Sequence, residues 1–79
     1  METERLRQIL AEGMDHEHLA LEGDGRHFDL TIVSTAFRGL GKIQQHQMIY
    51  KVLGDLMKED VHALIIKTYT PETWAEQNK

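Results

Sequence analysis

Histidine is the side chain with which this chain could bind a soft metal. The 79 residues contain five histidines and no cysteine. Neutral imidazole is a common metal ligand, whereas thiolate would have to come from another molecule. His62 is the best-placed candidate, because it opens an apolar segment that runs into a Thr70-Pro71 helix start. A soft metal or cluster site here would therefore combine imidazole with borrowed thiolate.

Each histidine also has a structural interpretation. A lone histidine at a strand end usually hydrogen-bonds to backbone, and spacing alone favours that role for His62. His16 and His18 would project from one strand face and bind Zn²⁺ or Ni²⁺ weakly. A structural zinc site needs four ligands, typically including thiolates, so a solvated strand edge is the preferred interpretation of this pair. His46 lies in a predicted helix, where packing or capping against the preceding loop explains it at least as well as ligation.

The sequence predicts a non-enzymatic protein. There is no cysteine nucleophile and no Gly-x-Ser-x-Gly segment, and Ser34 has no convincing base in its sequence context. No Walker or Rossmann glycine pattern is present.

Length and composition predict one globular domain spanning residues 1–79. A hydrophobic fraction of 41% and a charged fraction of 28% are ordinary for such domains, and without cysteine no disulfide can support the core. We find no secretory signal and no apolar run approaching the ~20 residues that span a bilayer. A cytoplasmic protein is expected, although the mature chain of a processed precursor would look the same.

The net charge of −4 is unevenly distributed. Residues 1–30 carry eight acids and three bases, and residues 55–79 carry five acids and three bases. Residues 31–54 carry three bases and no acid. The overall charge argues against non-specific nucleic-acid binding, and the central segment is a local exception.

The N-terminal part predicts a helix followed by an antiparallel hairpin. Thr3 is a suitable N-cap, and Gly13 is a suitable C′ residue for a helix with i, i+3, i+4 apolar spacing. Two stretches of alternating apolar and polar residues then flank a turn at Gly23-Asp24-Gly25. The inward residues of these two strands are Leu19, Leu21, Phe28, Leu30 and Ile32.

The second half predicts a loop, a helix, a strand and a short last helix. Phe37 anchors the loop from Ser34 to Gly41, and the helix runs from Lys42 to Lys58. Its apolar face consists of Ile49, Val52, Leu53 and Leu56, extended by Ile43 and Met57. The third strand runs from Val61 to about Tyr69, with His62, Leu64, Ile66 and Thr68 on one face. Thr70 caps the last helix, and Trp74 packs that helix against the domain.

The order of these elements is α-β-β-α-β-α. Helices packed on one side of a three-stranded sheet give a two-layer α+β domain.

Several short segments resemble the BolA-like family over nearly the whole chain. No single segment is diagnostic, but their order and spacing in so short a chain are highly specific. The glycine-flanked hairpin turn most resembles the smaller, acid-responsive bacterial branch of the family. The segments are Gly23-Asp-Gly-Arg-His-Phe28, Val33-Ser34, Phe37-Arg-Gly39, Gln45-His46, Met48-Ile-Tyr50, His62-Ala-Leu64 and Thr70-Pro-Glu-Thr-Trp74.

The resemblance implies a KH-like α+β fold, in agreement with the predicted order of elements. It also implies binding to a monothiol glutaredoxin of the CGFS type, with a shared [2Fe-2S] cluster used in iron–sulfur assembly, trafficking or iron sensing. The partner's cysteine and a glutathione thiol would supply the soft ligands, so no cofactor is expected in the isolated chain. Some bacterial members are described as DNA-binding regulators of stress or morphology genes, which is the alternative function. Neither activity is enzymatic.

The resemblance also implies which residues bind the cluster. The family's cluster-binding histidine precedes the Ala-Leu of the third strand, a position that His62 occupies here. Imidazole can replace thiolate on one iron of such a cluster. A second ligand, His or Cys, comes from the loop joining the first two strands, and His27 is the histidine nearest to it. Some members place that ligand nearer Asp24, where this chain has neither residue, so His27 could also be a plain strand residue.

The basic central segment is the candidate surface for nucleic acid or a partner. A loop-to-helix junction offers free N–H groups to phosphate, but the Gly-x-x-Gly loop of KH modules is not met. Three positive charges would give weak, salt-sensitive DNA binding. An acidic partner or the carboxylates of glutathione is the preferred interpretation, and an open strand edge would permit a homodimer. The candidate residues are Arg38, Gly39, Gly41, Lys42, His46 and Lys51.

Overall fold

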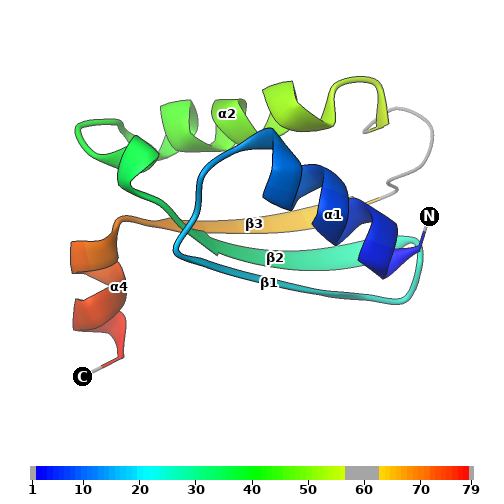
Figure 1. Ribbon diagram of the computed structural model, residues 1–79, viewed down its shortest axis with the longest axis horizontal. Helices are drawn as coiled ribbons and strands as arrows, with labels where there is room; N and C mark the ends of the chain where they lie inside the picture. Colours follow the sequence, from blue (N-terminus) through cyan, green and yellow to red (C-terminus); the bar gives the residue numbers. More distant parts are fainter. Residues whose placement is uncertain (1, 57–62, 79) are drawn as a thin grey trace.

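The computed structural model describes residues 2–56 and 63–78 (Figure 1). The order α-β-β-α-β-α is confirmed, with a short 3-10 turn, η1, added before the second helix. In the part of the chain described, no helix is both long enough and apolar enough to cross a membrane. The elements are α1 (Thr3–Gly13), β1 (His18–Gly23), β2 (His27–Val33), η1 (Thr35–Phe37), α2 (Lys42–Leu53), β3 (Ala63–Tyr69) and α4 (Pro71–Gln77).

The three strands form one mixed sheet in the order β1-β2-β3. The predicted hairpin is confirmed: β1 and β2 are antiparallel, with Leu21 opposite Leu30. In contrast, β3 runs parallel to β2, with Leu64 opposite Phe28. Parallel strands cannot be joined by a tight turn. The segment between them, which includes η1 and α2, therefore returns the chain to the end of the sheet where β2 begins.

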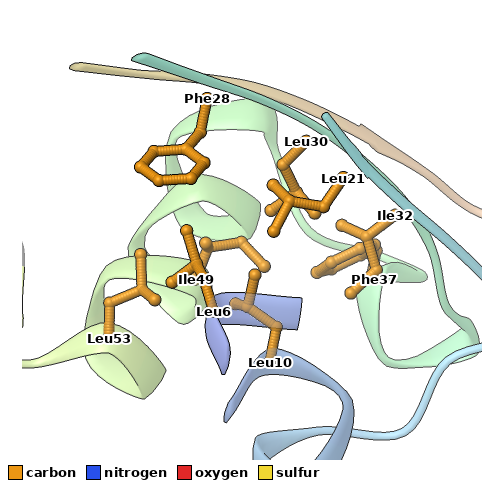
Figure 2. Close-up of a cluster of buried hydrophobic side chains, with 9 residues drawn as sticks. All are labelled: Leu6, Leu10, Leu21, Phe28, Leu30, Ile32, Phe37, Ile49 and Leu53. Atoms are coloured by element: carbon orange, nitrogen blue, oxygen red, sulfur yellow. The ribbon is translucent and has the colours of Figure 1, made fainter. Parts of the chain in front are cut away.

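Helices α1 and α2 cover one face of the sheet and form the core with it (Figures 1 and 2). The predicted inward residues of β2 are buried, as is the predicted loop anchor Phe37. Leu64 and Ile66 of β3 pack against this core, as their predicted face requires. The core cluster consists of Leu6, Leu10, Leu21, Phe28, Leu30, Ile32, Phe37, Ile49 and Leu53.

The capping of α1 and the role of the glycine at its end differ from the prediction. The N-cap residue is Glu2, which makes no side-chain cap hydrogen bond. Thr3 is the first helical residue, and its hydroxyl donates instead to the Gly23 carbonyl at 3.5 Å. The helix does end at Gly13, but this glycine is needed for close packing, because a Cβ there would clash with Val52 of α2.

Helix α2 is shorter than predicted, and its predicted face is confirmed at Ile49, Val52 and Leu53. It ends at Leu53 because Gly54 adopts a φ of 55°, a left-handed conformation that does not continue an α-helix. Lys58 and Met57 lie outside the described residues. Ile43 is 77% exposed, so its assignment to the core was wrong. Gln45 takes the inward position at i, i+4, i+8 with Ile49 and Leu53.

Among the described elements, only α4 packs on the other face of the sheet, at one end, and this face is called the open face below. Side chains alternate along a strand, and the even-numbered residues of β2 point into the core. The open face therefore consists of His18, Ala20, Glu22, His27, Asp29, Thr31, Val33, Ala63, Ile65, Lys67 and Tyr69.

Helix α4 holds one end of the open face. Thr70 caps it as predicted, accepting the Thr73 N–H at 3.2 Å. The predicted packing of Trp74 is confirmed, because its ring lies 5.0 Å from the His18 ring and 5.2 Å from the Tyr69 ring. Both partners belong to the open face, so α4 lies away from α1 and α2 (Figure 1).

Candidate functional site

The first candidate site lies at the end of the sheet where β2 and β3 begin. His27 is the first residue of β2 and is paired with Ala63, the first residue of β3. The Ala63 N–H donates to the Arg26 carbonyl at 3.1 Å, which holds the two strand ends together. Ala63 directly follows His62 in the chain. His62 itself lies outside the described residues.

Asp24 positions the backbone and side chain of His27. Its Oδ1 accepts the N–H groups of His27 at 2.8 Å and Arg26 at 2.9 Å. These hydrogen bonds stabilise the carboxylate and lower the pKa of Asp24 from its ordinary value of 3.8 to about 2. The second oxygen, Oδ2, lies 3.5 Å from Nδ1 of His27. An ionised carboxylate therefore lies beside one nitrogen of an exposed imidazole.

The turn before His27 tolerates no side chain at Gly23. A Cβ at this position would lie 2.5 Å from Cδ1 of Phe28 and 2.6 Å from the His27 carbonyl oxygen. Phe28 is buried in the core and cannot move away without cost. The glycine of the predicted turn is thus a steric requirement of the site.

The donor set here fits a shared metal centre better than a self-contained one. In residues 2–56 and 63–78, no three His, Asp or Glu side chains come together in a way that could hold a metal ion, and the chain has no cysteine. A metal-binding histidine usually has its other ring nitrogen beside a carboxylate or carbonyl. His27 and Asp24 have this arrangement. The described residues can supply one oriented imidazole, and soft ligands must come from another molecule.

The basic segment is largely occupied by contacts within the chain. Arg38 forms a two-point ion pair with Glu72 of α4, which raises the pKa of Arg38 and lowers that of Glu72. The ammonium group of Lys42 donates a hydrogen bond to the Thr68 carbonyl, and its Nζ lies 5.0 Å from the centre of the Tyr69 ring. These contacts compete with phosphate for both cations.

The N–H groups expected at the loop-to-helix junction are partly used within the chain. The Gly41 N–H already donates to the side-chain oxygen of Gln44 at 3.0 Å. Gly39 has a φ of 79° and open space around the position of a Cβ, so it is required for its backbone conformation. Lys51 follows Lys42 by nine residues, or about 13 Å along the helix. The three predicted cations therefore do not form one compact patch.

A buried hydrogen-bond network beneath the basic segment was not anticipated. The Gln45 amide donates to the Leu40 carbonyl at 2.8 Å and to the Phe37 carbonyl at 3.4 Å. Its oxygen accepts the Thr68 hydroxyl at 2.6 Å. Gln45 thus performs the loop-packing role considered for His46, which is half-buried on α2. The signal in the sequence was a glutamine four residues before Ile49 on the helical core face.

His16 and His18 do not share a strand face. His16 precedes β1, and its Nδ1 lies 3.2 Å from the Met14 carbonyl oxygen. His18 begins β1 and stacks on Trp74 with an angle of 21° between the ring planes. Both side chains are exposed, so the interpretation as a solvated edge is closer to the structure than a metal pair.

A mixed three-stranded sheet, two covering helices and an exposed imidazole at the open face define a small α+β domain. A family model described as BolA-like protein matches residues 3–73. The chain therefore belongs to the BolA-like family.

Named relatives and solved structures agree with this assignment. The chain is 38% identical over 71 residues to the DNA-binding transcriptional regulator BolA of Haemophilus influenzae, covering 90% of this chain and 69% of the relative. It is 30% identical over 80 residues to the acid stress protein IbaG of Escherichia coli, covering 100% of this chain and 95% of the relative. A BolA protein homologue from Coxiella burnetii has a TM-score of 0.83 at 33% identity, covering 95% of this chain and 97% of that one. These relatives are named as a regulator and a stress protein, and no enzyme family is indicated.

Proposed function

We propose that this chain is a non-enzymatic adaptor that binds a monothiol glutaredoxin and shares a bridging [2Fe-2S] cluster with it. His62 and His27 are the ligands from this chain, and the glutaredoxin cysteine and glutathione supply the thiolates. The observation that carries the proposal is the pairing of His27 with Ala63, the chain neighbour of His62. This pairing places His27 beside the first described residue of β3, and the assignment of His62 rests on its sequence context.

The residues around His27 define what this chain contributes. A cluster with mixed imidazole and thiolate ligands supplies a redox-active, transferable iron–sulfur unit with a raised potential. Asp24 accepts the His27 backbone N–H, and its Oδ2 lies 3.5 Å from Nδ1 of the ring, an arrangement common beside a metal-binding imidazole. The strand pairing fixes the position of that ring relative to β3.

Cluster reconstitution on a monothiol glutaredoxin, with and without this protein, tests the ligand assignment. We expect this chain to change the visible absorption and circular dichroism of the cluster. His62→Ala should abolish that change, and His27→Ala should reduce it. His16→Ala is a matched control, because His16 is also exposed but precedes β1. An unchanged spectrum in His62→Ala would refute the assignment of His62.

Iron and acid-labile sulfide measured on the co-purified complex test a simpler alternative. In that alternative, the protein binds apo-glutaredoxin and only blocks or remodels it. A complex with one-to-one protein content but no iron or sulfide, even when purified without oxygen, would favour this alternative over cluster sharing.

DNA binding is the second candidate, and the name of the Haemophilus influenzae relative favours it. Titration of duplex DNA at two salt concentrations tests it. The slope of log K against log[salt] is about −0.9 for each phosphate that the protein neutralises. Because Arg38 and Lys42 already have partners, we expect a shallow slope and no sequence preference. A steep slope that Lys42→Ala reduces would instead support a DNA-binding regulator.

A further inference from the structure

A shallow hollow lies on the open face beside His27. Its described lining combines an exposed apolar side chain, Ile65, with three carboxylates, those of Glu22, Asp24 and Asp29. Ile65 is 58% exposed even though it lies within a strand. Among the described residues that line the hollow there is no lysine or arginine. The hollow therefore combines an exposed apolar side chain with three carboxylates, which are called the anionic rim below.

The cross-strand pairing makes this anionic rim unfavourable in the isolated protein. Glu22 and Asp29 are direct partners on β1 and β2, and like charges in that relationship destabilise a sheet. Lys67 approaches Asp29 with its Nζ 3.6 Å from Oδ2. This exposed pair offsets one of the rim's three negative charges. A cation supplied from outside would relieve the remaining repulsion.

The two ends of the open face differ in how they are covered. At the Tyr69 end, Trp74 of α4 stacks on His18, and Val33 in the same row of the sheet is buried. At the other end, Ile65 remains exposed. The chain thus covers one end of the open face with its own helix and leaves an apolar side chain exposed at the end beside His27.

We infer that this hollow is the docking surface for the thiolate-bearing partner, whose contacting surface carries basic side chains around an apolar patch. The inference rests on the proposed function. His27 and Asp29 are two residues apart on β2, a separation of about 7 Å, and Asp29 pairs with Ile65. A protein that places a thiolate at His27 from the open face therefore comes within reach of the Ile65 row. An acidic, apolar hollow suits a partner with the opposite charge.

Titration of the ¹⁵N-labelled protein with a cluster-free glutaredoxin tests this surface by NMR. The glutaredoxin carries Ser in place of its active-site Cys, so docking is measured without cluster ligation. We expect Ile65→Lys to weaken binding by at least about tenfold, since it removes an apolar anchor and adds a positive charge that repels the basic surface of the partner. Ile65→Glu removes the same contact but keeps the sign of the rim, so it should weaken binding less than Ile65→Lys.

Ile43→Lys is the matched control, because Ile43 is exposed on α2, which covers the opposite face of the sheet. Its affinity should stay within about twofold of wild type. Equal binding by wild type and both Ile65 variants overturns the docking surface. If the cluster spectrum still depends on His62 and His27 in that case, the proposed function stands without this docking surface. Absence of binding by wild type in both cluster-free and cluster-loaded forms overturns the surface and the function together.

Sedimentation of the protein alone tests a second copy of this chain as the occupant. We expect Ile65→Lys to leave the sedimentation coefficient unchanged. A wild-type dimer that Ile65→Lys dissociates would assign the hollow to self-association and overturn its assignment to the glutaredoxin.

Discussion

Arg38 and Glu72 are 34 residues apart in sequence and form a two-point ion pair, with Nε 2.7 Å from Oε1 and Nη2 3.0 Å from Oε2. This geometry matches the planar guanidinium fork to the carboxylate. The pair joins the segment after η1 to the first turn of α4. Together with the Trp74 stack on His18, it positions the last helix.

Removing this ion pair should loosen α4. We expect Glu72→Gln to shift the fluorescence emission of Trp74 to longer wavelength and to increase its quenching by acrylamide, because the ring loses part of its contact with His18 and Tyr69. Trp74 is the only tryptophan, so the signal reports this helix. Glu12→Gln on α1 makes the same change in charge and should leave the emission as in wild type. An unchanged signal in Glu72→Gln would show that the stack alone holds α4.

Acid should loosen α4 in the same way. Arg38 lowers the pKa of Glu72 below its ordinary value of 4.5 in the folded protein. A carboxyl with a lowered folded-state pKa stabilises the fold above its unfolded-state pKa, and this contribution is lost as pH falls through the folded-state pKa. The Trp74 emission should therefore shift as pH falls below about 4.5. Glu72→Gln should lack this transition, and a transition of the same size in that variant would exclude Glu72 as its source.

The network between Gln45 and Thr68 should contribute to stability through its satisfied buried groups. Thr68→Val keeps the shape but removes the hydroxyl that donates to Gln45. Leaving a buried acceptor without a donor costs about 1–3 kcal/mol, measurable by urea unfolding. Gln45→Leu should cost more than Thr68→Val, because it also removes the donor to the Leu40 and Phe37 carbonyls. Thr31→Val on the open face is the control, with an expected change within about 0.5 kcal/mol. A Thr68→Val variant as stable as wild type would contradict the network's role.

Gly13→Ala should destabilise the protein, although alanine is the better helix former by about 1 kcal/mol. The added Cβ would clash with Val52, and overpacking of this kind costs about 1–3 kcal/mol. Thermal or urea unfolding measures the change. Val52→Ala in the same chain should reduce the cost of Gly13→Ala, because it removes the clashing methyl groups. A stabilised Gly13→Ala variant would show that the two helices move apart freely.

The order of helices and strands, the hairpin and most of the core were predictable from the sequence. Apolar period and turn chemistry act locally, as in the Gly23-Asp24-Gly25 turn and the alternation around Phe28, Leu30 and Ile32. The family assignment was also predictable, because it depends on short segments in a set order. The choice of His62 as a ligand comes from the same sequence context and stays a prediction.

The tertiary structure decided which charges and polar groups are already used. The sequence shows Arg38, Lys42 and Gly41 as an available cationic junction, but each has a partner in the folded chain. Two of these partners, Glu72 and the Thr68 carbonyl, lie far along the sequence, so local pattern cannot reveal them. The burial of Gln45 and the exposure of Ile43 on α2 have the same cause, since the partners of Gln45 lie on β3 and in the loop before α2. The pairing of His27 with Ala63 arises only when a parallel strand returns to the start of β2.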